Sequence, residues 1–363
     1  DGEASKGRFY IWKGKGYNRN MSKKLRINMM SSSEKIAGQG VSGAYRELMR
    51  LLKREAKNEL EITENKIKSA DITHYHTIDP NFFLTTLTGK KVGRKIGYVH
   101  FLPETLDGSL KMPGVSRKIF GKYVTSFYNR MDHLVVVNPI FIEDLVSFGI
   151  PREKISYIPN FVNKEKWFPL SKEEKNDFRQ KMGWGENDFV VMGAGQIQKR
   201  KGIDDFVKLA KANPDVKFVW AGGFSFGKIT DGYEKYKAII ENPPKNLKFT
   251  GIIPQEEIRK FYSAVDLFFL PSFNELFPMT ILEAASCGAP IMLRDLELYR
   301  VILDGKYLPA KDFNEMNLRV REIFENREIL DNLAKKSAEI SKEYSEEALL
   351  KIWLDFYREQ AGK

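Results

Sequence analysis

Short apolar runs alternate with longer amphipathic segments along most of this 363-residue chain. In the first half, apolar and β-branched runs predict strands at 25–30, near 62, 72–75, 95–100 and 133–137, with a helix at about 41–57. In the second half, the pattern predicts strands at 188–195, 217–221, 247–250, 267–270 and 290–293, and an amphipathic helix at 346–360. This alternation of strands and helices predicts an α/β fold with parallel sheets.

The two series of strands predict two Rossmann-like domains, with ligands at the strand carboxyl ends facing a central cleft. A turn-rich segment at 159–163 separates them. We therefore expect an N-terminal domain at 25–163, a C-terminal domain at 164–340 and a final helical segment at 341–363 that crosses back to the first domain. Residues 1–24 are polar and rich in Gly and Lys, so we expect a leader or tag there, outside the folded domains.

The composition excludes several classes of protein. A hydrophobic content of 42% with 12% aromatic residues supports two buried cores rather than a disordered chain. The single cysteine, Cys287, excludes an internal disulfide and is consistent with a reducing cytosol. No apolar run reaches the length of a transmembrane helix.

The net positive charge is confined to the first part of the chain. Residues 1–160 contain 27 Lys and Arg against 16 Asp and Glu, whereas the remainder contains 32 of each. The 90–130 segment alone has nine basic residues against two acidic ones. A one-sided basic surface indicates an anionic partner, either a membrane surface or a nucleic acid. No recognisable module with base-stacking aromatics is present, which argues against nucleic acid.

The most informative chemistry lies between the strand at 267–270 and a helix that begins near Pro278. Glu275 lies in the loop and Glu283 in the helix, inside an apolar stretch where an unpaired carboxylate is costly. The helix N-terminus favours phosphate, and the carboxylates accept hydrogen bonds from sugar hydroxyls. This arrangement favours a nucleotide-sugar site. The alternative is a helix cap and a solvated helix residue.

A cationic loop at 195–202 follows the first strand of the second domain. Its consecutive cations Lys199, Arg200 and Lys201 end at a glycine and a predicted helix start. At a strand carboxyl end, these charges would neutralise a pyrophosphate leaving group, although a solvated charge run is the alternative.

A glycine-rich segment at 38–43 matches G-x-G-x-x-G and includes Gly40. It leaves an NAD-dependent oxidoreductase as a rival interpretation. However, residues 31–37 separate the strand from the first glycine, whereas the dinucleotide fingerprint begins directly after its strand. The segment favours close approach to a diphosphate, with a plain flexible loop as the other alternative.

A third candidate surface is an apolar stripe at helical spacing within 111–131. Its residues can insert in a membrane interface or pack in the core, and the sequence leaves both open. The stripe comprises Ile119, Phe120, Tyr123, Val124, Phe127, Tyr128 and Met131, flanked by Arg117, Lys118 and Lys122.

Of the four histidines, His100 ends a predicted strand and is expected to face the cleft. His74 and His76 share one strand face without a visible third ligand. No D-x-D sequence follows a strand in the way a metal-dependent sugar transferase requires. We therefore expect no metal.

These motifs make the segment 25–360 resemble the retaining GT-B glycosyltransferases of family 4. The resemblance is carried by Glu275-x7-Glu283, the 195–202 loop and the glycine loop around Gly40. It is closer to the bacterial synthases that add a second hexose to monoglucosyl-diacylglycerol, through the segments 27–35, 98–103 and 220–227. A family 4 enzyme with another acceptor and a sugar-binding protein without activity are the alternatives.

The resemblance implies a UDP-hexose donor, with galactose favoured over glucose, and a glycolipid acceptor at the anionic cytoplasmic face of the membrane. It further implies retention of the anomeric configuration and no cofactor. Glu275 would contact the donor sugar, Glu283 the ribose, and Lys201 the diphosphate, while His100 would contact the sugar near the reacting carbon. The backbone at Ile252 and Ile253 would hold uracil. The other donor-binding positions implied are Gly40, Gln196, Lys199, Arg200, Leu276, Phe277 and Pro278. Gln196 departs from the family, which usually has Arg there.

Overall fold

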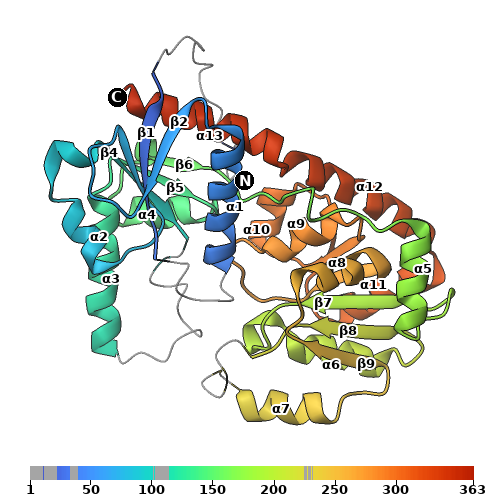
Figure 1. The fold of residues 1–363 in the computed structure, drawn as a ribbon. Helices are drawn as coiled ribbons and strands as arrows, with labels where there is room; N and C mark the ends of the chain where they lie inside the picture. Colours follow the sequence, from blue (N-terminus) through green and yellow to red (C-terminus); the bar gives the residue numbers. More distant parts are fainter. Residues whose placement is uncertain are drawn as a thin grey trace, which may run out of the picture. The chain divides into compact units, whose positions relative to one another are not determined.

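The computed structural model describes residues 11, 23–32, 40–100, 102, 114–224, 227, 230 and 232–363 (Figure 1). Contacts divide the chain into two compact units, one formed by Asp1–Phe161 and Glu346–Lys363, the other by Val162–Ser345. The chain therefore leaves the first unit within the turn-rich segment and returns to it for its last helix. The expected leader, apart from residues 11, 23 and 24, and the glycine segment before Gly40 lie outside the described residues.

The first unit has a parallel six-stranded sheet in the order β2-β1-β3-β4-β5-β6. Its strands are β1 Leu25–Met30, β2 Leu60–Glu64, β3 Ile72–Tyr75, β4 Arg94–Val99, β5 His133–Val136 and β6 Ile155–Tyr157. Its helices are α1 Gly40–Glu55, α2 Pro80–Thr85, α3 Gly114–Asn129, α4 Phe141–Ser147 and α13 Glu346–Ala361. Helix α13 packs beside α1 (Figure 1). It also packs against β3.

The second unit has a parallel six-stranded sheet in the order β12-β11-β10-β7-β8-β9. Its strands are β7 Val190–Ala194, β8 Lys217–Ala221, β9 Leu247–Gly251, β10 Leu267–Leu270, β11 Ile291–Arg294 and β12 Leu308–Ala310. Its helices are α5 Lys172–Lys181, α6 Ile203–Ala212, α7 Tyr233–Glu241, α8 Gln255–Ala264, α9 Met279–Ser286, α10 Glu297–Leu303, α11 Phe313–Glu325 and α12 Glu328–Glu343. The α/β class with two Rossmann-like sheets is confirmed.

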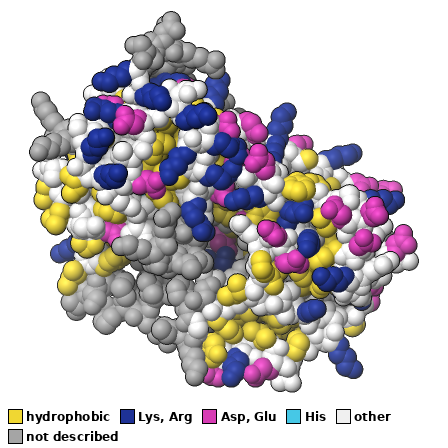
Figure 2. Space-filling view, viewed as in Figure 1, with side chains coloured by type: hydrophobic (Ala, Val, Ile, Leu, Met, Phe, Trp, Pro, Cys, Tyr) yellow, Lys and Arg dark blue, Asp and Glu magenta, His cyan; other side chains and the backbone are white. Residues whose placement is uncertain are grey.

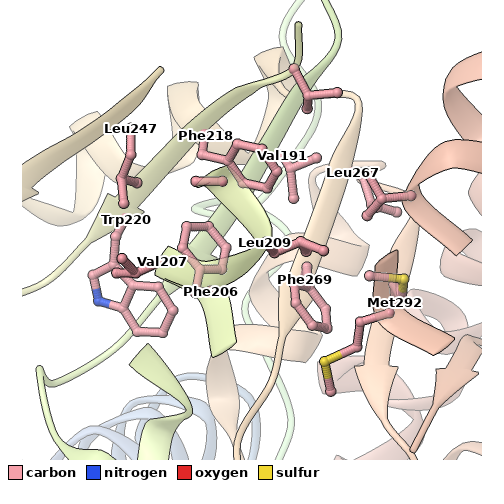
Figure 3. Close-up of a cluster of buried hydrophobic side chains, with 14 of the residues drawn as sticks. Val191, Phe206, Val207, Leu209, Phe218, Trp220, Leu247, Leu267, Phe269 and Met292 are labelled. Carbon is pink, nitrogen blue, oxygen red and sulfur yellow. The ribbon is translucent and has the colours of Figure 1, made fainter. Parts of the chain in front are cut away.

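The core of the second unit explains why its strands read as continuous apolar runs. Trp220 and Phe218 of β8, Phe269 of β10 and Phe206 of α6 are all buried and pack together (Figure 3). Parallel strands covered by helices on both faces have no solvated side. Apolar residues therefore fill consecutive positions rather than alternate ones.

The strand orders fix where ligands can bind. In the first sheet the order reverses between β1 and β3, and in the second between β7 and β10. Connections leave such neighbouring strands toward opposite faces, which opens a crevice at their carboxyl ends. The cationic loop follows β7 and the Glu275 loop follows β10, so both lie at the reversal point of the second sheet.

The sequence pattern does not predict two of the strands. β6 and β12 have three residues each and form the last strand of their sheets. A run this short is below the four to eight residues at which alternation or apolar character indicates a strand. The other ten strands agree with the predicted positions within about two residues.

Candidate functional site

Two loops meet at the carboxyl edge of the second sheet. The backbone N–H of Phe273 donates to the carbonyl of Arg200 (2.9 Å), which joins the loop after β10 to the one after β7. The Arg200 guanidinium in turn donates to the carbonyl of Asn274 (2.7 Å). These backbone contacts bring together the cations and the carboxylate that the sequence placed 74 residues apart.

A buried ion pair forms the centre of this group. Lys201 Nζ lies 2.5 Å from Glu275 Oε1, and Arg200 NH1 lies 3.5 Å from Glu275 Oε2. The Glu275 side chain is 5% exposed and that of Lys201 is 12% exposed. Two cations against one carboxylate leave this group with a net positive charge, which suits a polyphosphate.

The charge state of Glu275 follows from its neighbours. Burial opposes its ionisation, but Lys201 and Arg200 outweigh that cost and hold the pKa of Glu275 below its ordinary value. Glu275 is therefore a carboxylate at neutral pH and can only accept hydrogen bonds. A carboxylate of this kind suits sugar hydroxyls and disfavours direct contact with phosphate.

Close backbone approach brings the loops after β7, β8 and β9 together. Gly222 N donates to Gly251 O (2.9 Å), and Ile197 N donates to Gly223 O (3.1 Å). A Cβ on Gly222, whose φ is +141°, would lie 1.9 Å from the carbonyl oxygen of Gly195. Only glycine fits there.

Ile252 and Ile253 follow Gly251 directly, so they lie at the edge that holds the cationic loop. Ile252 is 74% exposed, so its side chain lies at the surface rather than in the core. Leu276, Phe277 and Pro278 lead into α9, for which Pro278 is the N-cap residue.

Gln196 does not join the ion pair. Its Oε1 accepts a hydrogen bond from Gln198 Nε2 (2.6 Å). Lys199 is exposed, whereas Arg200 faces Glu275. Arg200 is therefore the cation beside Lys201 in this group, and Lys199 stays in solvent.

Glu283 lies in α9 and differs from its expected environment. It is half-buried rather than fully buried, and the Tyr262 hydroxyl lies 3.5 Å from its Oε2. The Glu283 carboxylate is therefore partnered in this structure, and its contact with a ligand stays a prediction. Burial raises the pKa of the nearby Cys287 to about 12, which makes this thiol a poor nucleophile.

In the first unit, His100 belongs to a cluster of three buried histidines. The rings of His74 and His76 lie 4.1 Å apart, and those of His76 and His100 lie 6.2 Å apart, in each case between centroids. His74 Nδ1 lies 2.9 Å from the Tyr357 hydroxyl of α13. Among the described residues, His76 and the His100 Nε2 atom have no hydrogen-bond partner.

Burial keeps these rings uncharged. It lowers the pKa of His74 to about 3 and that of His100 to about 4, and it holds the pKa of His76 well below its ordinary value. His100 can therefore donate or accept a hydrogen bond but cannot supply a positive charge. In the described part of the chain, no group of three or more His, Cys, Asp or Glu side chains could hold a metal ion.

Two family models match this chain. Residues 174–340 match the group 1 glycosyl transferases, and residues 38–166 match glycosyltransferase family 4. The alpha-galactosylglucosyldiacylglycerol synthase of Streptococcus pneumoniae strain R6 is 64% identical over 94% of this chain and 91% of its own length. The chain belongs to glycosyltransferase family 4.

A more distant relative and two solved structures are also similar to this chain. The processive diacylglycerol alpha-glucosyltransferase of Acholeplasma laidlawii is 28% identical over 50% of this chain and 53% of its own. The sucrose-phosphate synthase of Thermosynechococcus elongatus has a TM-score of 0.74 at 15% identity, covering 93% of this chain and 99% of that one. Anabaena HepE in complex with UDP and glucose has a TM-score of 0.72 at 14% identity, covering 93% and 100%. At these identities the two structures establish the GT-B fold alone.

Helix α3 of this glycosyltransferase has a buried end and an exposed end. Phe127 is 1% exposed and packs against Tyr75 of β3 (5.7 Å between centroids), so of the two alternatives left open for it, core packing is correct and membrane insertion is not. Ile119, two turns earlier, is 66% exposed, and Lys118 and Lys122 beside it are exposed. Among the described residues, no helix combines the length and apolarity needed to cross a bilayer.

The other residues of the stripe lie between these extremes. Phe120 and Tyr123 are half-buried, and the Tyr123 hydroxyl donates to the carbonyl of Ile78. The side chain of Arg117 lies outside the described residues. The core interpretation is therefore correct for the end of α3 nearest Asn129, and a surface role is restricted to its first turns.

The sequence pattern did not predict two polar clusters of this glycosyltransferase. At the reversal point of the first sheet, Ser32 Oγ and Thr77 Oγ1 both donate to Asp79 Oδ2 (2.7 and 2.5 Å). At the second sheet, buried Arg294 ends β11 and donates to the carbonyl of Pro271 (2.9 Å). Ser32 and Asp79 are 47 positions apart, and Arg294 and Pro271 are 23 apart, so the strand order rather than the sequence pattern reveals these partners.

The first prediction concerns the histidines of the glycosyltransferase. All four, including His133, are buried with a lowered pKa. Their imidazole NMR resonances should therefore not titrate between pH 8 and 5. The unfolded chain binds protons near pH 6.5, so the free energy of unfolding should decrease as the pH falls below that value. Urea unfolding at pH 7 and pH 5.5 measures this. A resonance that titrates near pH 6.5 would contradict the burial.

Proposed function

We propose that this glycosyltransferase transfers galactose from UDP-galactose to a glucosyl-diacylglycerol, with retention of the anomeric configuration. The observation that carries the proposal is the buried group of Arg200, Lys201 and Glu275 at the carboxyl edge of the second sheet. It combines cations for a diphosphate with a carboxylate for sugar hydroxyls. The name of the pneumococcal relative supplies the sugar and the acceptor.

The donor is oriented along this edge. Lys201 and Arg200 bind the diphosphate together with the N-terminus of α9, whose unpaired N–H groups favour negative charge. Glu275 accepts hydrogen bonds from the hexose hydroxyls, and Glu283 accepts them from the ribose. The backbone at Ile252 and Ile253 holds the uracil.

The reaction breaks the bond between the anomeric carbon and the diphosphate oxygen, and it forms a bond from that carbon to an acceptor hydroxyl oxygen. We infer attack on the same face, with the hydroxyl proton passing to the departing phosphate oxygen and UDP released. Lys201 and Arg200 stabilise the charge that develops on the diphosphate, so the residues supply positioning and electrostatic stabilisation without a metal or cofactor.

The decisive experiment is a transfer assay with radiolabelled UDP-galactose and UDP-glucose on monoglucosyl-diacylglycerol in EDTA. We expect a diglycosyl lipid mainly from UDP-galactose and undiminished turnover in the chelator. A product only on a different acceptor would favour the other family 4 activities. Turnover that disappears in EDTA and returns with Mg²⁺ or Mn²⁺ would overturn the proposed charge stabilisation.

Substitutions of the two glutamates should have different effects, one on UDP binding and the other on turnover. Glu283→Ala should weaken UDP binding by roughly 1–3 kcal/mol, the scale for hydrogen bonds to a charged group. Glu275→Gln should retain UDP affinity, because it removes a negative charge beside Lys201 and Arg200, and it should lower kcat. Calorimetry with UDP and steady-state kinetics measure both effects. Equal losses of UDP affinity in the two variants would refute this division of roles.

We also propose that the first unit docks the enzyme reversibly on the anionic cytoplasmic face of the membrane. The net charge of +11 lies within residues 1–160. In Figure 2, Lys and Arg side chains outnumber Asp and Glu over the first unit, whereas both signs are mixed over the second. The exposed end of α3, with Ile119, Lys118 and Lys122, combines apolar and basic side chains as interfacial helices do.

Charge reversal tests this docking. Arg117→Glu/Lys118→Glu/Lys122→Glu should reduce binding to anionic liposomes by at least about 100-fold, since each cation near such a surface is worth about 1 kcal/mol. UDP affinity should not change. Wild-type binding should weaken as salt rises and be absent on zwitterionic liposomes.

The matched control is Lys172→Glu/Lys181→Glu/Lys245→Glu, which reverses three exposed lysines of the second unit. It changes the net charge equally and should leave sedimentation with liposomes intact. If both triple variants lose binding equally, total charge rather than α3 governs docking.

A further inference from the structure

Arg294 is a buried cation in the second unit that the proposed reaction does not use. It is the last residue of β11 and is 7% exposed. Its Nε donates to the carbonyl of Pro271 (2.9 Å) and its NH1 to the carbonyl of Lys311 (3.1 Å), while NH2 pairs with the carboxylate of Asp205. One guanidinium thus holds three separate segments of the chain.

These partners come from the carboxyl ends of neighbouring strands. Pro271 follows β10 and Lys311 follows β12, the two strands on either side of β11. Asp205 lies in the first turn of α6, directly after the cationic loop. Arg294 therefore ties the start of α6 to the start of the Glu275 loop.

The two loops also approach each other closely at Pro271. A Cβ on Gly202, whose φ is +73°, would lie 2.2 Å from the carbonyl oxygen of Pro271, the same atom that accepts from Arg294. Lys201 precedes Gly202, and Glu275 lies four residues after Pro271. The separation of the Lys201 and Glu275 backbones thus depends on where this carbonyl is held.

Arg294 also contacts the surface of the Glu275 loop. Its guanidinium carbon lies 3.9 Å from the centroid of the Phe273 ring, which is 51% exposed. A cation over an aromatic face stabilises the ring in place. Phe273 is the residue whose N–H donates to Arg200 O, so this contact restrains the Arg200 side of the site as well.

We propose that Arg294 is a positioning residue for the donor site. It sets the spacing of Lys201, Arg200 and Glu275 without touching the donor. The inference rests on the proposed UDP-sugar function and names a residue on which donor affinity depends. The planar fork is essential, because an ammonium is a single point charge and does not hold three acceptors in fixed directions.

The chain contains a matched control in Arg179 of α5. This residue is also 7% exposed, and it donates to the carbonyls of Ala264, Gly185 and Asp188 and to the carboxylate of Asp266. Asp188 and Asp266 precede β7 and β10, so Arg179 lies at the amino ends of the strands. The two arginines have similar burial and partners at opposite edges of one sheet.

The experiment compares Arg294→Gln and Arg294→Lys with Arg179→Gln and Arg179→Lys in the full chain. Melting temperature, UDP affinity by calorimetry, and KM for each substrate are measured. The melting temperature of all four variants should be lower than that of the wild type, because each substitution leaves buried hydrogen-bond acceptors unpaired. Only the Arg294 variants should weaken UDP binding and raise the donor KM, by about tenfold or more, because small misplacements of binding groups are costly. The acceptor KM should not change.

If the Arg294 variants do not fold, the variant Asp205→Asn tests the same proposal. It loosens only the α6 contact and should weaken UDP binding in the same direction by a smaller factor. Normal UDP affinity in folded Arg294 variants, or in Asp205→Asn when they do not fold, would overturn the positioning role while leaving the proposed function intact. A wild-type protein that does not bind UDP would overturn the proposed function, and the positioning role with it.

Discussion

The buried pair of Lys201 and Glu275 is the interaction that joins the two loops of the proposed donor site. Removing two charges from water is costly, and a buried pair often contributes little net stability. Here the pair is the meeting point of two loops that end adjacent strands, with Arg200 as a second cation. The pair therefore matters more for the positions of the two side chains than for stability. It holds a cation and a hydrogen-bond acceptor within one hydrogen-bond length of each other, at the reversal point of the sheet.

The backbone around this pair leaves little freedom. Gly222 and Gly202 lie so close to neighbouring carbonyls that a side chain at either position would overlap them. The loops can therefore approach each other as bare backbone, and Arg294 holds the carbonyl of Pro271 where they do. A parallel sheet supplies this geometry because all its strands end at the same edge.

Much of this architecture could be predicted from the sequence. The apolar runs located ten strands, and the loops with Lys201 and Glu275 stood out because charge follows directly after a buried strand. The three-residue strands β6 and β12 carry no periodic signal. The partners of Arg294 are unpredictable for a different reason: positions 205, 271 and 311 become neighbours only through the strand order. The stripe of α3 was ambiguous because a core and a membrane interface select the same residues. Burial against Tyr75 decides it for Phe127 but not for Ile119.

The two units differ in net charge, because the first is positive and the second is nearly neutral. This difference suits a lipid acceptor at an anionic surface and a water-soluble donor. The first unit has an excess of positive charge, and its buried histidines are uncharged at neutral pH. Its long-range attraction is therefore to an anionic surface. The second unit has nearly equal numbers of acidic and basic residues, and its Lys201 beside Glu275 is only 12% exposed, which shields this cation from salt. Salt should thus weaken membrane docking more than donor binding, so the two steps respond separately to ionic strength.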